Sequence, residues 1–279
     1  MTPEYAFCFV LQRGKLELQG LLLVLSLVKN VRCSYEIIVA VPNLYGEISR
    51  EVSEVLEALG VKIVYIKNQI SSDYPIGNKF SCVEHADNVT NARYLVFLDT
   101  DMFCNQSFDS VPEIEKYDLS LRVAGFAKWK NEEQWEPLYK MFDLPLPIER
   151  IFSLRTEEKM LPYFNGGFIG LHAKSSFPQT WLETAQIIYK SFQGERSRLH
   201  WLDQIAIPIT IQRLGLRYQC VAPKYNSTPT TREGAIFQHY HHFHRLWEEI
   251  PLCKPLLVSI FHDYPWLQER VNKFMEEER

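Results

Sequence analysis

Apolar and polar positions alternate in a regular rhythm over the first hundred residues. Short apolar, β-prone runs predict strands, and the longer segments between them predict helices, with apolar residues at helical spacing in 48–59. The predicted strands are 5–11, 35–41, 61–66 and 94–98, and the predicted helices are 16–28, 48–59 and 79–92. Strands that alternate with helices form a mostly parallel sheet with right-handed crossovers. The pattern therefore predicts an α/β fold in which strand 94–98 lies inside the sheet.

This rhythm changes after residue 104. The predicted strands there are 123–129, 163–171 and 236–244, and the predicted helices are 178–193, 202–214 and 266–279. Segment 135–151 is rich in proline and aromatic residues, which is the composition of an irregular covering loop. No repeat, low-complexity tract or linker separates the two parts, so we expect one domain over residues 1–279.

Strand 94–98 runs directly into two carboxylates, Asp99 and Asp101, with only Thr100 between them. Residues two apart on an extended backbone point to the same side. Both carboxylates therefore project from the strand's C-terminal end, where open α/β sheets bind ligands. Clustered carboxylates repel one another unless a positive charge lies between them, and a hard divalent cation is a common solution. A solvated strand-to-loop turn, in which Asp is frequent, is the alternative.

The composition indicates a globular protein and argues against several functional classes. Apolar content of 46%, charged content of 23% and a net charge of −4 are typical of a globular chain and argue against nucleic-acid binding. The six cysteines show no C-x-x-C spacing, so we expect reduced thiols and neither a zinc site nor a disulfide framework. The apolar stretch 20–28 is too short to span a bilayer and lacks a cleavage pattern. We therefore expect a cytoplasmic protein without a transmembrane segment.

Three further motifs follow the acidic pair in a fixed order. They are Phe164-Asn165-Gly166-Gly167, then Trp201-Leu202-Asp203-Gln204, then a His-rich segment that runs from Phe237 to His244. This order resembles the GT-A glycosyltransferases, nucleotide-sugar enzymes with a Rossmann-like first half. Within that group it is most similar to the glycogenin and bacterial lipopolysaccharide galactosyltransferase type. The resemblance covers residues 5–245.

The resemblance implies a metal-dependent transferase. It would move a sugar from a nucleotide-sugar donor, UDP- or GDP-linked, to a hydroxyl of a glycan or small acceptor. Mn²⁺ or Mg²⁺ is the implied cofactor, because a divalent ion stabilises the negative charge that develops on a diphosphate leaving group. The resemblance also divides the single domain into a nucleotide-binding half, 1–104, and an acceptor-binding half with the C-terminal helix, 105–279.

Residue by residue, the resemblance assigns the metal to Asp99, Asp101 and His239. His241 is the alternative histidine, because it shares the same side of a strand. The implied nucleotide- and donor-binding residues are Lys79, Asp99, Thr100, Asp101, Asn165, Gly166 and Gly167, and the implied catalytic residues are Asp203 and Gln204. Arg13, just after the first predicted strand, could also meet the base or the phosphates. The Gly and Lys-Pro-Trp that follow the histidine in the resembling family are absent, and Arg245-Leu246-Trp247 stands there instead.

Ordinary structural roles are the alternatives for these residues. Asp203 at a helix start could be an N-cap, the glycine pair a tight turn, and either histidine a packed or solvated ring. Trp129, Trp135 and Tyr139 could stack on an acceptor sugar or be buried. The Asp-Gln pair favours retention of anomeric configuration, whereas an inverting enzyme would need a carboxylate base, a part that Asp203 could play.

Three other functions compete with glycosyl transfer. A haloacid-dehalogenase phosphatase needs its Asp-x-Asp after the first strand, whereas this pair follows the fourth, and Phe103 stands where Thr or Val is expected. A sugar nucleotidyltransferase needs a Gly-rich loop after the first strand, but segment 12–15 holds a single glycine. The third alternative is a non-catalytic GT-A-like domain that binds a nucleotide or a partner, and the intact acidic pair argues against it.

Overall fold

The computed structural model describes residues 2–125, 132–192, 199–228 and 234–278. Its central sheet has seven strands in the order β10-β6-β9-β4-β1-β2-β3. The first four strands are β1 (Tyr5–Val10), β2 (Tyr35–Pro42), β3 (Lys62–Ile66) and β4 (Tyr94–Leu98). All pairings among them are parallel, and β4 lies between β1 and β9. The predicted parallel sheet with an interior fourth strand is therefore confirmed.

Three later strands extend the sheet beyond β4: β6 (Leu119–Val123), β9 (Phe164–His172) and β10 (Tyr218–Cys220). Strand β9 is antiparallel to both of its neighbours, β4 and β6, whereas β10 is parallel to β6. Two separate antiparallel ribbons complete the strands, β5 (Met102–Cys104) with β11 (Phe237–His239), and β7 (Ile151–Phe152) with β8 (Lys159–Met160).

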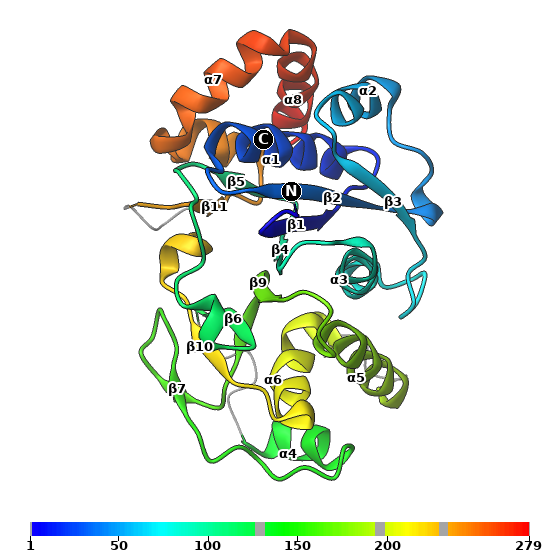
Figure 1. The fold of residues 1–279 in the computed structure, drawn as a ribbon, viewed down its shortest axis with the longest axis vertical. Coiled ribbons are helices and arrows are strands. Elements are labelled where there is room, and N and C mark those ends of the chain that lie inside the picture. The colour runs from blue at the N-terminus through cyan, green and yellow to red at the C-terminus, as the bar shows by residue number, and fades with distance from the viewer. Residues whose placement is uncertain (1, 126–131, 193–198, 229–233, 279) are drawn as a thin grey trace.

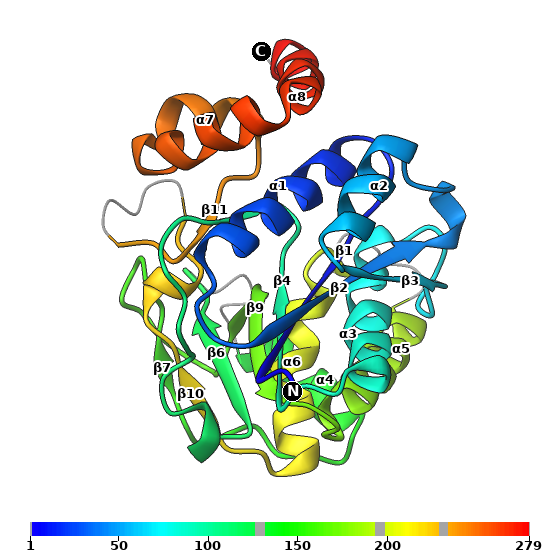
Figure 2. The same cartoon turned by 45° about the horizontal axis from the view of Figure 1, so that its top comes forward.

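Helices cover both faces of the sheet (Figures 1 and 2). One face carries α1 (Lys15–Asn30), α2 (Arg50–Ala58), α7 (Lys254–Asp263) and α8 (Pro265–Glu277). The other carries α3 (Asn78–Val89), α5 (Phe177–Ser191) and α6 (Leu202–Leu214), with α4 (Glu132–Lys140) beyond α6. Strand β1 shows why there are two cores: Tyr5, Phe7 and Phe9 face the first set of helices, and Ala6, Cys8 and Val10 face the second.

Two features of the sheet bring distant segments to the end of β4. Strand β9 pairs with β4 as far as Phe168 and with β6 at Asn165, and the register shifts in between. The backbone N–H of Asp99 donates to the carbonyl of Gly167 at 2.9 Å, so the glycine pair lies against the acidic pair. Ribbon β5–β11 places His239 opposite Met102, one residue after Asp101.

Segment 135–151, predicted to be an irregular loop, begins as a helix, which corrects the prediction. Helix α4 spans Glu132–Lys140, and its side chains Trp135, Leu138 and Tyr139 are buried. These positions are three and four residues apart, which places them on one face of a helix. The proline and aromatic content drew attention away from this spacing.

Two predicted strands also differ from the structure. Strand 236–244 is reduced to three residues, β11, because His241 has a left-handed backbone with φ of 63°, and a π-helix, Arg245–Glu249, follows. The strand predicted at 123–129 lies earlier, as β6, and residues 126–131 are outside the described part of the chain. Helix α7 and strands β5 and β10 were not predicted.

Two observations concern the expected lack of a transmembrane segment and the expected state of the cysteines. Among the helices in the described ranges, none has the length and apolarity that crossing a membrane requires. All six cysteines are free thiols, and four of them are buried.

Candidate active site

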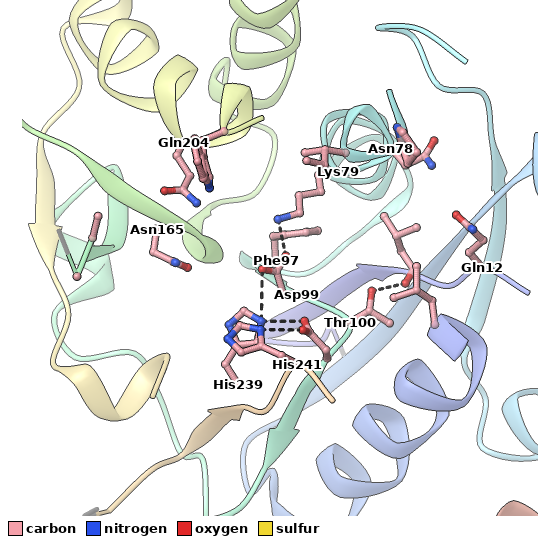
Figure 3. A pocket seen from close by; sticks show the side chains of 18 residues that line it. Gln12, Asn78, Lys79, Phe97, Asp99, Thr100, Asn165, Gln204, His239 and His241 are labelled. Atoms are coloured by element: carbon pink, nitrogen blue, oxygen red, sulfur yellow. Dashed lines mark hydrogen bonds and ion pairs between the residues drawn. The ribbon is translucent and has the colours of Figure 1, made fainter. Parts of the chain in front are cut away.

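A pocket of about 530 Å³ opens at the C-terminal ends of β1 and β4 (Figure 3). This is the edge at which parallel α/β sheets bind ligands. Eight of the predicted site residues line it: Lys79, Asp99, Thr100, Asp101, Asn165, Gln204, His239 and His241. They come from β4 and its following turn, α3, β9, α6 and the end of β11, so the pocket unites all four sequence motifs.

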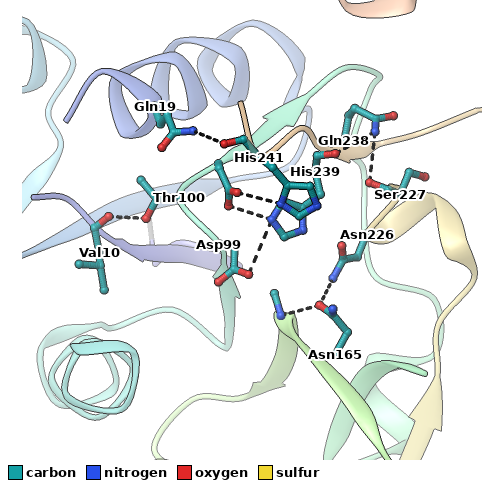
Figure 4. A network of polar contacts seen from close by, with 12 residues as sticks. Val10, Gln19, Asp99, Thr100, Asn165, Asn226, Ser227, Gln238, His239 and His241 are labelled. Atoms are coloured by element: carbon teal, nitrogen blue, oxygen red, sulfur yellow. Dashed lines mark hydrogen bonds and ion pairs between the residues drawn. The ribbon is translucent and has the colours of Figure 1, made fainter. Parts of the chain in front are cut away.

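Asp101 is held by both candidate histidines. Its Oδ1 lies 2.9 Å from Nε2 of His239, and its Oδ2 lies 3.3 Å from Nδ1 of His241. The two imidazole rings are neighbours, with centroids 4.1 Å apart (Figures 3 and 4). The left-handed backbone of His241 turns its carbonyl toward α1, where Nε2 of Gln19 donates to it at 3.3 Å. The sequence offered the two histidines as alternatives, and the structure brings both to Asp101.

These three residues fit a metal ion. Each presents one ligand atom, and the three atoms lie within 4.8 Å of one another. A carboxylate oxygen with two imidazole nitrogens is a common donor set for divalent transition metals. Asp99 is less well placed, since its Oδ2 is 3.9 Å from Nε2 of His239 and its other oxygen is engaged elsewhere.

Lys79 lies between two carboxylates. Its Nζ is 2.7 Å from Oδ1 of Asp99 and 3.0 Å from Oδ2 of Asp203. The ammonium thus joins α3 to the end of β4 and to the first turn of α6. Asp203 is 3% exposed and does not line the pocket, whereas its neighbour Gln204 does. The tryptophan of α5 supports this turn, because Nε1 of Trp181 donates to the carbonyl of Asp203 at 3.1 Å.

The pKa values follow from this charge arrangement. Burial raises the pKa of Asp101, but His239 and then His241 oppose it and hold that pKa well below its usual range. Burial lowers the pKa of His239, and Asp101 more than offsets this, so the net direction is upward. Burial lowers the pKa of Lys79, but Asp203 and Asp99 more than offset this, so the net pKa lies above its ordinary value. Burial raises the pKa of Asp99, with Lys79 opposing.

The two glycines of the Asn-Gly-Gly motif make room for the acidic side chains. A Cβ on Gly166 would lie 2.5 Å from Oδ2 of Asp203, and one on Gly167 would lie 2.7 Å from Oδ2 of Asp99. Asn165 is fixed beside them, because its Oδ1 accepts from the N–H of Gly167 at 2.8 Å and from Nδ2 of Asn226 at 2.7 Å (Figure 4). The glycines therefore allow β9 to approach the carboxylates closely.

Sequence reasoning missed several pocket residues and misplaced one neighbour. Gln12 and Asn78 line the pocket, although only the adjacent Arg13 and Lys79 were singled out (Figure 3). Arg13 lines a separate cavity with Glu47 and other residues around α2. Gln12 and Arg13 lie between β1 and α1, outside any regular strand, so the sequence pattern does not indicate which of the two side chains faces the pocket.

The aromatic residues considered for acceptor stacking are placed as follows. Trp135 and Tyr139 are 2% and 0% exposed, and Trp135 packs against Tyr163 with ring centroids 5.7 Å apart. Both are therefore core residues, as the alternative reading had it. Trp129 lies outside the described residues.

A second histidine group lies next to the pocket. His242 and His244 surround Glu278, which follows α8, with nitrogen–oxygen distances of 3.4 and 3.2 Å. Lys15 also pairs with Glu278, and its Nζ is 3.2 Å from Nδ1 of His242. The ammonium already supplies the positive charge here. The His-rich segment thus divides into one pair that faces Asp101 and another that anchors the C-terminal end to α1.

Comparison with known proteins identifies the family and the fold. Residues 7–215 match the model of the Rhodobacterales glycosyltransferase domain. The chain belongs to this family. Its fold is similar to the crystal structure of LgtC, solved as an active-site mutant in which glutamate replaces glutamine. The TM-score is 0.54 at 10% identity, over 91% of this chain and 95% of that one. No curated protein matches the sequence.

The protein is therefore a glycosyltransferase with the GT-A fold, as the order of motifs predicted. Family membership favours this function over the phosphatase, the nucleotidyltransferase and the non-catalytic domain.

The close approach of β9 can be tested with one methyl group. Gly166→Ala would place a Cβ against Asp203 and force that carboxylate away from Lys79, so we expect a loss of about 1–3 kcal/mol in the free energy of unfolding and slower sugar transfer. Gly125→Ala is the matched control, because its Cβ would meet only ordinary contacts, the nearest being Cδ of Arg155 at 3.6 Å. Denaturant unfolding of both variants measures the difference. Equal stability of the two would contradict the tight packing of Gly166.

Proposed function

We propose that this glycosyltransferase moves a sugar from a UDP- or GDP-linked donor to a hydroxyl of a glycan or small acceptor, in a reaction that depends on Mn²⁺ or Mg²⁺. The observation that carries the proposal is the convergence of Asp101, His239 and His241 in one pocket with the Asp99–Lys79–Asp203 cluster. One buried carboxylate, Asp203, and two partly buried ones, Asp99 and Asp101, attract cations, and a diphosphate needs such a cation as its partner.

The donor set favours Mn²⁺ over Mg²⁺. Mg²⁺ prefers oxygen ligands in near-ideal octahedral geometry, whereas two of the three side chains here offer imidazole nitrogen. When bound, the ion would supply Lewis-acid stabilisation of the negative charge on the departing diphosphate. The chain's own part is to hold Asp101 ionised and to fix both imidazole rings beside it.

The two ends of the pocket suit different parts of the substrates. One end, lined by Val10, Gln12 and Asn78, lies after β1 and at the start of α3, and we assign it to the nucleotide. The other end, lined by Asn165, Trp201 and Gln204, we call the sugar end. Figure 3 shows Lys79 and Asp99 between these two groups. A donor that spans the pocket would thus bring its diphosphate beside the acidic cluster.

The placement of Asp203 and Gln204 supports retention of configuration. Gln204 faces the pocket, whereas Asp203 lies behind it in an ion pair with Lys79. An inverting enzyme needs a carboxylate base within hydrogen-bond reach of the acceptor hydroxyl. Asp203, buried and engaged by Lys79, is poorly placed for that part, and we assign it to positioning Lys79 and the first turn of α6.

Asp101 is the residue through which the metal proposal is best tested. Asp101→Asn keeps the size of the side chain and removes its charge. We expect Mn²⁺-dependent UDP binding, measured by calorimetry, to weaken at least about tenfold, because changes that only perturb the support of a metal ligand already cost about 10–100-fold. Asp118→Asn is the control, since Asp118 is partly exposed, lies outside the pocket and pairs with the exposed Arg217. Undiminished Mn²⁺-dependent binding by Asp101→Asn would refute the assignment.

The stereochemical proposal predicts the anomeric form of the product. With an α-linked donor, proton NMR of the first product formed should show the α-anomer. A β-linked product would indicate that Asp203 acts as the base on the acceptor hydroxyl, and would contradict its assignment to positioning Lys79 and the first turn of α6.

A further inference from the structure

Arg122, on β6, is a buried arginine that the proposed reaction does not use. It is 6% exposed, and its Nε has no hydrogen-bond partner within the described ranges. No ion pair joins it to a carboxylate in that part of the structure. Arginine is almost never fully buried unless it is paired. An unpaired guanidinium at this depth costs folding free energy, so its presence calls for a partner from outside the chain.

The charge at this position is reinforced by a second guanidinium. Burial and, to a lesser degree, the neighbouring Arg155 together lower the pKa of Arg122 to about 10. Arg122 remains charged at neutral pH, and no acidic residue in the described ranges pairs with it. The side chain of Arg155 lies over Gly125, with its Cδ 3.6 Å from the position a Cβ would take there.

Arg122 adjoins the sugar end of the pocket. Its partner across the β6–β9 ladder is Asn165, and directly opposed residues of an antiparallel pair project from the same face. Val123 and Phe164, the next pair, face the opposite way into the apolar core. Ala124 and Gly125, which directly follow β6, line the pocket wall.

A second unpartnered polar group belongs to Asn226, which is hydrogen-bonded to Asn165. Nδ2 of Asn226 donates to Oδ1 of Asn165, but the buried Oδ1 of Asn226 has no partner among the described residues (Figure 4). Asn165 thus has two neighbours with an unsatisfied polar atom: Arg122, whose Nε is a donor without an acceptor, and Asn226, whose Oδ1 is an acceptor without a donor. A ligand that carries both an anionic group and a hydroxyl would match the chemistry of this pair.

We propose that Arg122 forms an anion subsite at the sugar end and that one of the two substrates carries a carboxylate or a phosphate there. The planar guanidinium suits both groups, because it can donate two parallel hydrogen bonds to them. Either the transferred sugar or the acceptor supplies the anion. This inference deepens the proposed function and rests on it for the identity of the sugar end.

The experiment compares anionic and neutral ligands on the wild type, on Arg122→Met and on Arg217→Met. Arg217 is an exposed arginine paired with Asp118, which makes its variant the matched control. One calorimetric arm measures UDP-glucuronate against UDP-glucose with Mn²⁺, which tests an anion on the transferred sugar. The other measures glucuronate and glucose 6-phosphate against glucose in the presence of UDP and Mn²⁺, which tests an anion on the acceptor.

In at least one arm we expect the wild type and Arg217→Met to bind the anionic ligand at least roughly tenfold more tightly than its neutral partner, the scale of one charge-assisted hydrogen bond. Arg122→Met should lose this preference. Without ligand its melting temperature should equal or exceed that of the wild type, because an unpaired buried charge has been removed. No preference for anions in either arm, or a preference that survives in Arg122→Met, would overturn the subsite.

Binding of UDP separates this proposal from the proposed function. If UDP binds with Mn²⁺ but anionic and neutral ligands are equivalent, only the anion subsite fails. If neither UDP nor GDP binds with Mn²⁺, the proposed function fails, and thermal stabilisation by inorganic phosphate then decides the subsite. Stabilisation of the wild type that Arg122→Met lacks would support it, and equal responses would overturn it.

Discussion

The ammonium of Lys79, placed between Asp99 and Asp203, is the interaction on which the rest of the site depends. Three carboxylates lie close together at the end of β4, and in a partly buried setting they would repel one another strongly. Lys79 forms ion pairs with Asp99 and Asp203, whereas Asp101 is bound by His239 and His241. The acidic pair is thereby divided, with Asp99 in a structural ion pair and Asp101 available to a metal.

The separation of Asp99 from Asp101 by these ion pairs constrains where α3, α6 and β9 must lie. Helix α3 must present Lys79 toward the sheet, and α6 must begin where Asp203 can reach it. Strand β9 must come close enough for Gly167 to bond to the backbone of Asp99, which only residues without a Cβ permit. The three elements come from separate parts of the sequence, so the ion pair and the glycines position the pocket together.

Local patterns were sufficient to predict the first half of the fold. Strands β1 to β4 are short apolar, β-prone runs, the segment that forms α2 carries apolar residues at helical spacing, and the acidic pair follows the last strand directly. Long-range relations were beyond such patterns. No local signal indicates that Lys79 pairs with Asp99, that His241 adopts a left-handed backbone, or that Gln12 rather than Arg13 faces the pocket. Arg122 is the extreme case, since a single arginine in a short apolar strand becomes meaningful only once its neighbours across the sheet are known.

Direct location of the metal tests the central claim, that the acidic pair is divided between Lys79 and the histidines. Anomalous diffraction at the manganese edge, from crystals grown with UDP and Mn²⁺, would give its position without reference to a mutant. We expect one peak, coordinated by Asp101, His239 and His241, with Lys79 still bound to Asp99. A peak on Asp99 with Lys79 displaced, or no peak in the pocket of a crystal that contains bound UDP, would contradict the account.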